Sequence, residues 1–412
     1  MRPLPEAQRE VLAAVRRLPE LEVPLADALG LVLAAPVRAA HDVPPFANSA
    51  MDGYAVRAAD TAGAPVALRV LEDVPAGHVA GGRVEEGTAI KIMTGAPLPA
   101  GADAVVRVED TEAGGDALVR VLLPVVVGTA VRPAGGDVGA GSTVLEAGER
   151  LGPAHLGVLA SLGVARPPVR RRPRVAVLST GDEVVAPATA TLRPGQIRDS
   201  NRPLVMGLLA EAGVEVLDLG IVGDDRPLLE GALEKGAAEA DVVLTSGGVS
   251  MGEYDLVKQV LADVGRVGLW RVAMQPAKPF AFGSLGSTPF FGLPGNPVSV
   301  MVAFEQFVRP ALLQMMGSRR LFRPRLTGRL GEKVSTDPAK TVFVRVTTRY
   351  QDGEWWAQSS GGQSSNVLSA LARAEALAVV PQGVSEVGAG GEVELEMFRW
   401  PESRSYQEVL GE

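Results

Sequence analysis

The segment TSGGVSMGEYD, Thr245–Asp255, combines two adjacent glycines, three Ser or Thr hydroxyls and two carboxylates directly after the apolar run ADVVL. Glycine adopts backbone angles closed to other residues, so a turn through this pair can aim several N–H groups at one point. The segment therefore predicts an anion-binding cradle formed by Ser246, Gly247, Gly248 and Ser250. Glu253 and Asp255 would hold a divalent cation against the bound oxygens. The alternative is a tight turn between a strand and a helix, with solvated acids.

Two further loops follow predicted strands and carry similar residues. They are STGDE, Ser179–Glu183, and GLPGNPVS, Gly292–Ser299. Over residues 173–318, strand patterns alternate with helical patterns, which predicts right-handed crossovers and a mostly parallel sheet covered on both faces. Ligands of such sheets bind at the carboxyl ends of the strands, so we expect the three loops to converge. Asn296 followed by Pro297 is typical of a helix start, which would either bind phosphate or serve only as a cap.

Composition narrows the class of protein. The chain has 412 residues, of which 46% are hydrophobic and 21% charged, an ordinary composition for a globular protein of several domains. Its net charge of -8 argues against a nucleic-acid partner. With no cysteine and only three histidines, it lacks the material for disulfides, thiolate chemistry or a histidine-built zinc site. A charged N-terminus and no apolar run of about 18 residues predict a soluble, cytoplasmic protein without membrane association.

The sequence patterns of the helices and strands that must position these loops predict a multidomain α/β plus β fold. Helical spacing of apolar residues covers residues 5–18, 24–37 and 152–163, whereas short Val-rich runs between glycines indicate antiparallel strands. The predicted domains are a discontinuous helical linker domain (1–43 and 142–172), a β-rich domain (44–141), a central doubly wound, mostly parallel α/β domain (173–319) and a small C-terminal β domain resembling a barrel (320–412).

Seven motifs follow one another between Asn48 and Ser299: NSAMDGYAV, IMTGAPLPAGADAVV, STGDEV, DSNRPLV, TSGGVSMGEYD, KPFAFG and GLPGNPVS. In this order they resemble the molybdopterin molybdenumtransferase family, which includes bacterial enzymes and the C-terminal enzyme domain of gephyrin. The resemblance implies an α/β domain of the molybdopterin-binding type and insertion of molybdate into adenylylated molybdopterin with release of AMP. It also implies Mg²⁺ as cofactor, an elongated homodimer with active sites between subunits, and a molybdopterin adenylyltransferase as a partner protein.

The resemblance assigns roles to individual residues. It implies catalytic residues at Asp52, Thr94, Asp137 and Glu183, and metal ligands at Glu183, Asp224 and Asp255. It implies a molybdate pocket at Lys278, Ser299, Arg345 and Ser365. It implies further cofactor-binding residues at Thr180, Gly181, Ser246, Gly247, Gly248, Ser250, Pro294, Gly295 and Asn296. Each role has an alternative, because aspartates and a threonine in glycine-rich loops are common turn residues, and Arg345 on an alternating strand could belong to a solvated face.

Some positions depart from the family pattern. Arg271 and Gln275 stand where many members carry lysine, and the second change removes a charge. Near Ser365, the following residue is Asn366, and Glu375 stands where asparagine is usual. Two other functions stay open: a molybdopterin adenylyltransferase, against which the three extra domains argue, and a gephyrin-like scaffold without catalysis, against which the full set of acids argues.

Overall fold

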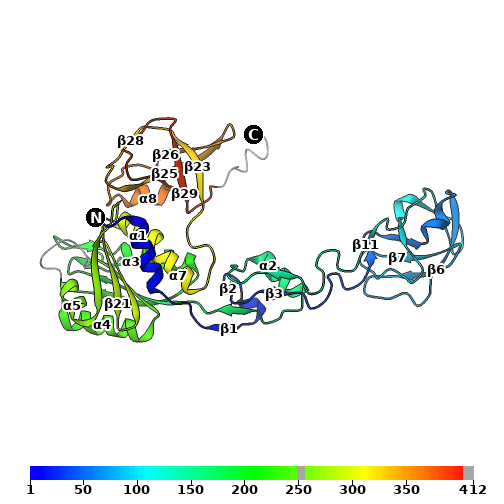
Figure 1. The fold of residues 1–412 in the computed structure, drawn as a ribbon, viewed down its shortest axis with the longest axis horizontal. Coiled ribbons are helices and arrows are strands. Elements are labelled where there is room, and N and C mark those ends of the chain that lie inside the picture. Colours follow the sequence, from blue (N-terminus) through cyan, green and yellow to red (C-terminus); the bar gives the residue numbers. More distant parts are fainter. Residues whose placement is uncertain (248–255, 402–412) are drawn as a thin grey trace. The chain divides into compact units, whose positions relative to one another are not determined.

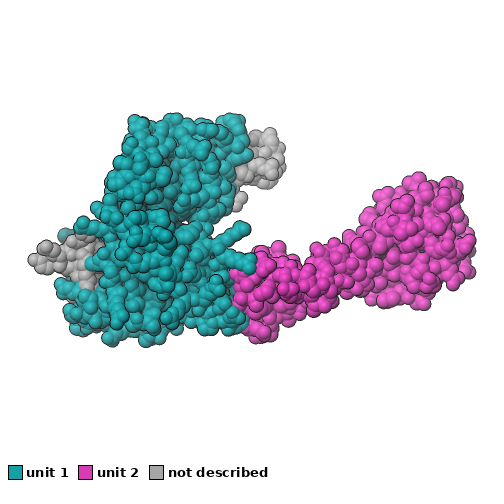
Figure 2. Space-filling model, viewed as in Figure 1, with its two compact units in different colours: residues 1–21, 30–32, 169–412 teal, residues 22–29, 33–168 magenta. Residues whose placement is uncertain are grey.

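The structure is a computed structural model that describes residues 1–247 and 256–401. The predicted site residues Gly248, Ser250, Glu253 and Asp255 therefore lie outside the described residues. The chain divides into two compact units (Figure 2). Unit 1 comprises residues 1–21, 30–32 and 169–412, and unit 2 comprises residues 22–29 and 33–168. The finer division into four domains stays a prediction.

A six-stranded sheet forms the centre of unit 1, in the spatial order β17-β14-β18-β22-β21-β19 (Figure 1). The first four strands run parallel, and the last two complete the sheet in antiparallel pairing. The strands are β14 (Arg174–Thr180), β17 (Glu215–Val222), β18 (Val242–Ser246), β19 (Arg266–Arg271), β21 (Pro279–Leu285) and β22 (Thr288–Leu293). The predicted mostly parallel sheet is confirmed.

Helices cover both faces of this sheet because its central strands carry apolar side chains on both sides. On β14, Val175 and Val177 join one apolar cluster with α1, α3, α6 and α7, whereas Ala176 and Leu178 join another with α4 and α5. The helices are α1 (Leu4–Ala14), α3 (Asn201–Ala212), α4 (Arg226–Glu239), α5 (Leu256–Val264), α6 (Pro297–Ala303) and α7 (Arg309–Met315), with the π-helical turn η4 (Phe304–Val308) between the last two. This is the doubly wound fold that the sequence predicts.

Local sequence explains where these helices begin and end. α4 starts after Asp225, whose carboxylate accepts a hydrogen bond from the Leu228 N–H at 3.0 Å and so satisfies one free donor of the first turn. α3 ends at Gly213, which has a φ of 78°. Glycine adopts this left-handed angle without a steric penalty, so the chain can turn back toward β17.

The C-terminal part of unit 1 is a closed five-stranded barrel, as predicted. Its strand order is β25-β26-β23-β29-β27, and β27 closes it by pairing with β25. The segment after β19 contributes β20 (Met274–Gln275), which adds to the barrel by parallel pairing with β25. The barrel elements are β23 (Arg325–Leu330), β25 (Thr341–Gln351), β26 (Glu354–Ser359), α8 (Leu368–Arg373), β27 (Ala376–Val380) and β29 (Glu392–Met397). Short paired strands in unit 1 are β15 (Val184–Val185) with β16 (Ile197–Arg198), and β24 (Val334–Ser335) with β28 (Glu386–Val387).

Unit 2 is rich in strands, as predicted for residues 44–141. Its six-stranded sheet has the order β8-β5-β7-β6-β10-β9, and apolar clusters form on both of its faces. The strands are β5 (Gly53–Val56), β6 (Val66–Val74), β7 (Thr88–Ile92), β8 (Ala104–Arg107), β9 (Thr111–Ala113) and β10 (Leu118–Val121). The unit also contains β3 (Val37–Arg38) paired with β12 (Thr143–Leu145), β4 (Asn48–Ser49) paired with β11 (Val131–Arg132), and α2 (Pro153–Ser161).

The predicted helix over residues 24–37 is wrong. This stretch contains the 3₁₀ turn η1 (Leu25–Asp27) and the strands β2 (Val32–Leu33) and β3. Gly30 has a φ of 76°, which is incompatible with a continuous helix. The buried run from residue 31 to residue 33 is short and apolar, and such a run cannot be assigned to helix or strand by periodicity alone. Two further short strands are β1 (Glu20–Glu22) and β13 (Pro168–Arg170).

Among the described residues, no helix combines the length and apolar character that crossing a membrane requires.

Candidate functional site

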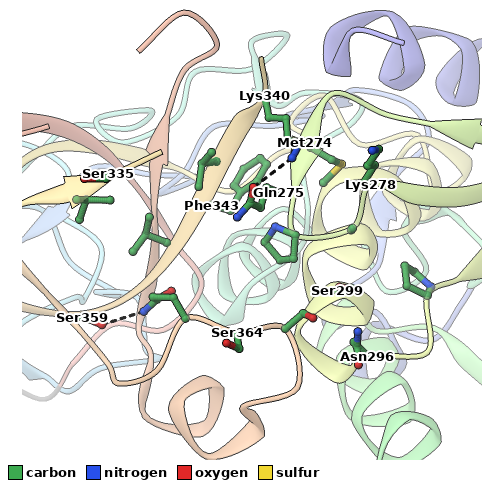
Figure 3. A pocket seen from close by; sticks show the side chains of 18 of the residues that line it. Met274, Gln275, Lys278, Asn296, Ser299, Ser335, Lys340, Phe343, Ser359 and Ser364 are labelled. Atoms are coloured by element: carbon green, nitrogen blue, oxygen red, sulfur yellow. Dashed lines mark hydrogen bonds between the residues drawn. The ribbon is translucent and has the colours of Figure 1, made fainter. Parts of the chain in front are cut away.

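Unit 1 contains a cleft of about 750 Å³, lined by the loop after β20, the start of α6 and parts of the barrel (Figure 3). Lining residues fall in three segments, 274–279, 294–299 and 332–365. The cleft brings together six residues that the sequence predicts for the site: Lys278, Pro294, Gly295, Asn296, Ser299 and Ser365.

A tight loop positions Lys278 in this cleft. The preceding residue, Ala277, is buried and has a φ of 71°, a left-handed conformation that residues with a side chain seldom adopt. The Val272 N–H donates to the Lys278 carbonyl at 2.9 Å, which closes the loop. The backbone of Lys278 is thus held at the cleft by a loop conformation that the packing around it must enforce.

The start of α6 forms a second wall. Asn296 is its N-cap residue, but the side chain makes no capping hydrogen bond. The Val298 N–H donates to the Ser365 carbonyl at 3.2 Å, so this helix start is tied to the barrel loop that carries Ser365. One of the N–H groups expected to be free for phosphate is therefore used, whereas the nearly buried Ser299 side chain lines the cleft.

Arg345 lies under the cleft and does not line it. Its side chain is fully buried, so the alternative of a solvated strand face is wrong. The guanidinium donates to the carbonyls of Gly362 and Ser364, and burial lowers the pKa of Arg345 below its ordinary range. The Gln363 amide pairs with the Arg345 backbone in both directions at 3.0 Å. Arg345 therefore holds the loop that presents Ser365.

The three predicted strand-end loops leave the sheet next to one another. In register, Ser179 of β14 pairs with Ser246 of β18, and Ser246 pairs with Leu293 of β22. The Gly247 N–H donates to the Leu293 carbonyl at 3.2 Å. Convergence of the loops is confirmed at the strand ends that the structure describes.

Buried hydroxyls gather at these strand ends. The hydroxyls of Ser179, Thr180 and Thr245 are buried, and none has a hydrogen-bond partner within the described part of the chain. Gly247 has a φ of 94°, and a Cβ there would stand 3.0 Å from the Thr180 carbonyl. A buried donor without a partner is unfavourable, so these hydroxyls are candidates for hydrogen bonds to groups outside the described residues.

Of the three predicted metal ligands, Glu183 and Asp224 are among the described residues and Asp255 is not. Gly181 has a φ of 127°, and a Cβ there would lie 2.3 Å from Oε2 of Glu183, so this position accepts only glycine with that carboxylate in place. Asp182 Oδ1 accepts the Asp224 N–H at 2.8 Å, which joins the loops after β14 and β17. Glu183 and Asp224 have the hard oxygen donors that Mg²⁺ prefers. In residues 1–247 and 256–401, however, no three Asp, Glu, His or Cys side chains form a group that could hold a metal ion.

The remaining predicted catalytic residues belong to unit 2. Asp52 and Thr94 lie together: Asp52 Oδ1 accepts the Thr94 N–H at 2.7 Å and the Thr94 hydroxyl at 2.8 Å. The backbone hydrogen bond, and then the hydroxyl, lower the pKa of Asp52. Asp137 is exposed in a turn, where its N–H donates to the Val43 carbonyl at 3.0 Å. Both the turn and the catalytic interpretation fit this geometry.

The positions that depart from the family pattern have separate roles. Gln275 lines the cleft, and its Oε1 accepts from Lys340 Nζ at 3.4 Å. Glu375 does not line the cleft, since its carboxylate accepts the N–H and hydroxyl of Thr348 at 2.7 and 3.0 Å. Sequence reasoning missed Lys340 because the pairing of β20 with β25, which brings it to the cleft, leaves no local signal in the sequence.

The fold and the site define a class: an α/β protein in which loops at the carboxyl ends of parallel strands adjoin a cleft lined by lysine and serine side chains. Family matches cover most of the chain. Residues 2–163 match the MoeA N-terminal region (domain I and II), residues 176–314 match a probable molybdopterin binding domain, and residues 327–398 match the MoeA C-terminal region (domain IV).

Complete proteins are similar over nearly their whole length. The chain is 42% identical over 405 residues to molybdopterin molybdenumtransferase 2 of Mycobacterium tuberculosis, covering 96% of this chain and 99% of that protein. It is 38% identical to the molybdopterin molybdenumtransferase of Haemophilus influenzae, with 91% and 93% covered. The crystal structure of the molybdopterin biosynthesis moeA protein from Pyrococcus horikoshii superposes with a TM-score of 0.84 at 30% identity, covering 97% of this chain and 100% of that chain. This chain belongs to the molybdopterin molybdenumtransferase family, and the resemblance in its motifs is confirmed.

Proposed function

We propose that this chain is a molybdopterin molybdenumtransferase, which inserts molybdate into adenylylated molybdopterin and releases AMP to give molybdenum cofactor. The observation that carries the proposal is the cleft lined by Lys278, Ser299 and Ser365. Residues 294–296, which follow the end of β22, line the same cleft. An oxyanion site therefore adjoins the strand-end loops, and a transfer between two bound substrates requires such proximity.

The lining of the cleft matches the chemistry of molybdate. A dianion needs fixed positive charge and hydrogen-bond donors, which the ammonium of Lys278 and the hydroxyls of Ser299 and Ser365 supply. Arg345 contributes as a positioning residue, because it holds the loop of Ser365 by donating to two of its carbonyls.

The phosphates of adenylylated molybdopterin are proposed to bind at the ends of β14 and β18. The described residues of this site are Thr180, Gly181, Ser246 and Gly247. The buried Thr180 hydroxyl, without a partner within the described residues, supports the assignment. Mg²⁺ would be held by Glu183, Asp224 and Asp255, and it would neutralise charge on the pyrophosphate.

The other predicted residues and partners complete the proposal. Asp52, Thr94 and Asp137 would act in an active site formed between the subunits of a homodimer. Adenylylated molybdopterin would come from a molybdopterin adenylyltransferase in the cytoplasm. The Asp52 carboxylate, whose ionised form is stabilised by the hydrogen bonds from Thr94, suits a role as a hydrogen-bond acceptor.

The dependence of AMP release on molybdate tests this function. Purified protein is incubated with adenylylated molybdopterin, Mg²⁺ and increasing molybdate, and AMP is quantified by chromatography. We expect a saturable dependence on molybdate. Lys278→Met should raise the molybdate concentration for half-maximal rate about tenfold, because it removes one charge-assisted interaction.

Lys235→Met is the matched control, because Lys235 is exposed on α4 and does not line the cleft. It makes the same formal change in charge and should retain the wild-type dependence. If wild-type AMP release is independent of molybdate, the molybdenumtransferase function is wrong, and an adenylyltransferase or a scaffold replaces it.

A further inference from the structure

The cleft is lined by more lysines than the sequence predicts. Of the predicted cations, only Lys278 lines it. Three lysines line it, at positions 278, 333 and 340. Lys333 pairs with Glu386 at 2.7 Å and its side chain is 60% exposed, so its charge is largely solvated. The Lys340 side chain is only 18% exposed, and Figure 3 shows it reaching toward Gln275. Lys340 is therefore a second cation of the cleft beside Lys278, and it is the less exposed of the two.

Strand pairing places Lys340 at the cleft. The next residue, Thr341, pairs with Met274 where β20 joins the barrel, and the Thr341 N–H donates to the Ala273 carbonyl at 2.9 Å. Lys340 Nζ then donates to Gln275 Oε1 at 3.4 Å. Gln275 precedes Lys278 by three residues on the same loop, so the barrel and the α/β domain each supply one ammonium group to the same cleft.

Asp337 holds Lys340 in the structure. Its Oδ2 lies 2.7 Å from Lys340 Nζ, and its Oδ1 accepts the Ala339 N–H at 3.0 Å. The hydrogen bond from Lys340 is the main cause that lowers the pKa of Asp337, and the positive charge of Lys278 adds to it. Two lysines that line the cleft thus act on the carboxylate of Asp337.

We propose that Lys340 binds the oxyanion substrate together with Lys278, and that Asp337 is an internal anion that competes for Lys340. The inference rests on the proposed function, which assigns molybdate to this cleft. A tetrahedral dianion has enough oxygens to accept from both ammonium groups, and charge-assisted hydrogen bonds of this kind are strong. The carboxylate of Asp337 is 41% exposed, so water can solvate it when the anion takes its partner.

This arrangement also gives selectivity for a dianion over a monoanion. A monoanion offers one negative charge, which is what Asp337 already supplies, so it gains little by displacing the carboxylate. A dianion attracts both lysines more strongly and outcompetes the carboxylate. The Asp337 carboxylate therefore disfavours binding of a monoanion, and it holds Lys340 in place for a dianion.

Calorimetry of molybdate binding to the full chain tests the proposal without reference to activity. Lys340→Met should raise the Kd for molybdate about tenfold, since one charge-assisted hydrogen bond is lost. Asp337→Asn removes the competing charge but keeps an oxygen for the Ala339 N–H, and should lower the Kd about threefold or more. Lys340→Arg keeps the charge and should stay closer to wild type than Lys340→Met, and Lys235→Met controls for net charge.

The opposite signs expected for Lys340→Met and Asp337→Asn exclude a general effect of stability or folding. If both variants bind molybdate within about twofold of wild type while Lys278→Met loses binding, the role of Lys340 and Asp337 is wrong and the proposed molybdate cleft stands. If Lys278→Met also retains wild-type binding, the cleft is not the oxyanion site, and both the inference and this part of the proposed function fail.

Discussion

At the scale of single residues, hydrogen bonds from Thr94 stabilise the ionised carboxylate of Asp52. Asp52 is exposed, yet the N–H and hydroxyl of Thr94 lower its pKa. Thr94→Val keeps the N–H and removes the hydroxyl, so the pKa of Asp52 should rise toward its ordinary value without reaching it. Because the folded pKa is lowered, this pair stabilises the fold above the ordinary pKa of aspartate, and that contribution is lost as the pH falls through the lowered value. A carbon-13 NMR titration of the Asp52 carboxyl measures the shift.

Thr94→Ser serves as the control for that titration, because it retains a hydroxyl at the same position. Its Asp52 pKa should stay near the wild-type value. An identical Asp52 pKa in wild type and Thr94→Val would show that the hydroxyl does not act on the carboxylate.

At the scale of elements, the loop that presents Ser365 depends on a buried guanidinium. Arg345→Met would leave the carbonyls of Gly362 and Ser364 without that donor, at a cost of about 2 kcal/mol in the free energy of unfolding. We expect faster amide hydrogen exchange over residues 361–367 and a higher molybdate requirement for AMP release, with little change in affinity for adenylylated molybdopterin. Hydrogen exchange by mass spectrometry and the molybdate titration measure these effects.

Arg329→Met is the comparison within the same barrel. Arg329 pairs with Glu354 at 2.9 Å on a solvated face, so its loss should leave exchange over residues 361–367 unchanged. A loop that exchanges at the wild-type rate in Arg345→Met, together with an unaltered molybdate requirement, would contradict the positioning role of Arg345.

At the scale of the whole molecule, a buried polar network connects the barrel to the α/β part of unit 1. Glu396 of β29 accepts from Gln306 of η4 at 2.6 Å and from Arg325 of β23 at 3.1 Å. Burial raises the pKa of Glu396, so the folded state retains a proton that the unfolded state has already lost. The retained proton stabilises the folded state at low pH. This stabilisation is lost as the pH rises from the ordinary glutamate pKa through the raised value. Glu396→Gln should lack that component in denaturant unfolding measured across this pH range.

Glu394→Gln provides the matched control, because Glu394 is on the same strand and its side chain is 59% exposed in its pair with Arg325. Its pH dependence of unfolding should follow the wild type. If Glu396→Gln and wild type show the same slope over this range, Glu396 is not the titrating group.

The sequence by itself determined the order of elements in the α/β part and the strand-end loops. Alternation of short apolar runs with helical spacing is a local property, and parallel strands bring their carboxyl ends to one edge by geometry alone. The family resemblance of the motifs also indicated Lys278, Ser299 and Ser365, which the structure brings to one cleft. Local patterns were insufficient for residues 24–37. Apolar residues recur there at helical spacing, but the structure forms short buried strands near Gly30, whose φ is in the left-handed region.

Only the tertiary structure decided which residues share the cleft and which support it. Arg345 and Lys340 are five residues apart on or beside β25, yet the first is fully buried under a loop and the second lines the cleft. The environment of Lys340 depends on β20, a segment more than sixty positions away that pairs with β25 and brings Gln275 to Lys340. Such pairing over a long sequence separation leaves no periodic signal in either segment, because a strand pattern records burial and not the identity of the neighbouring strand.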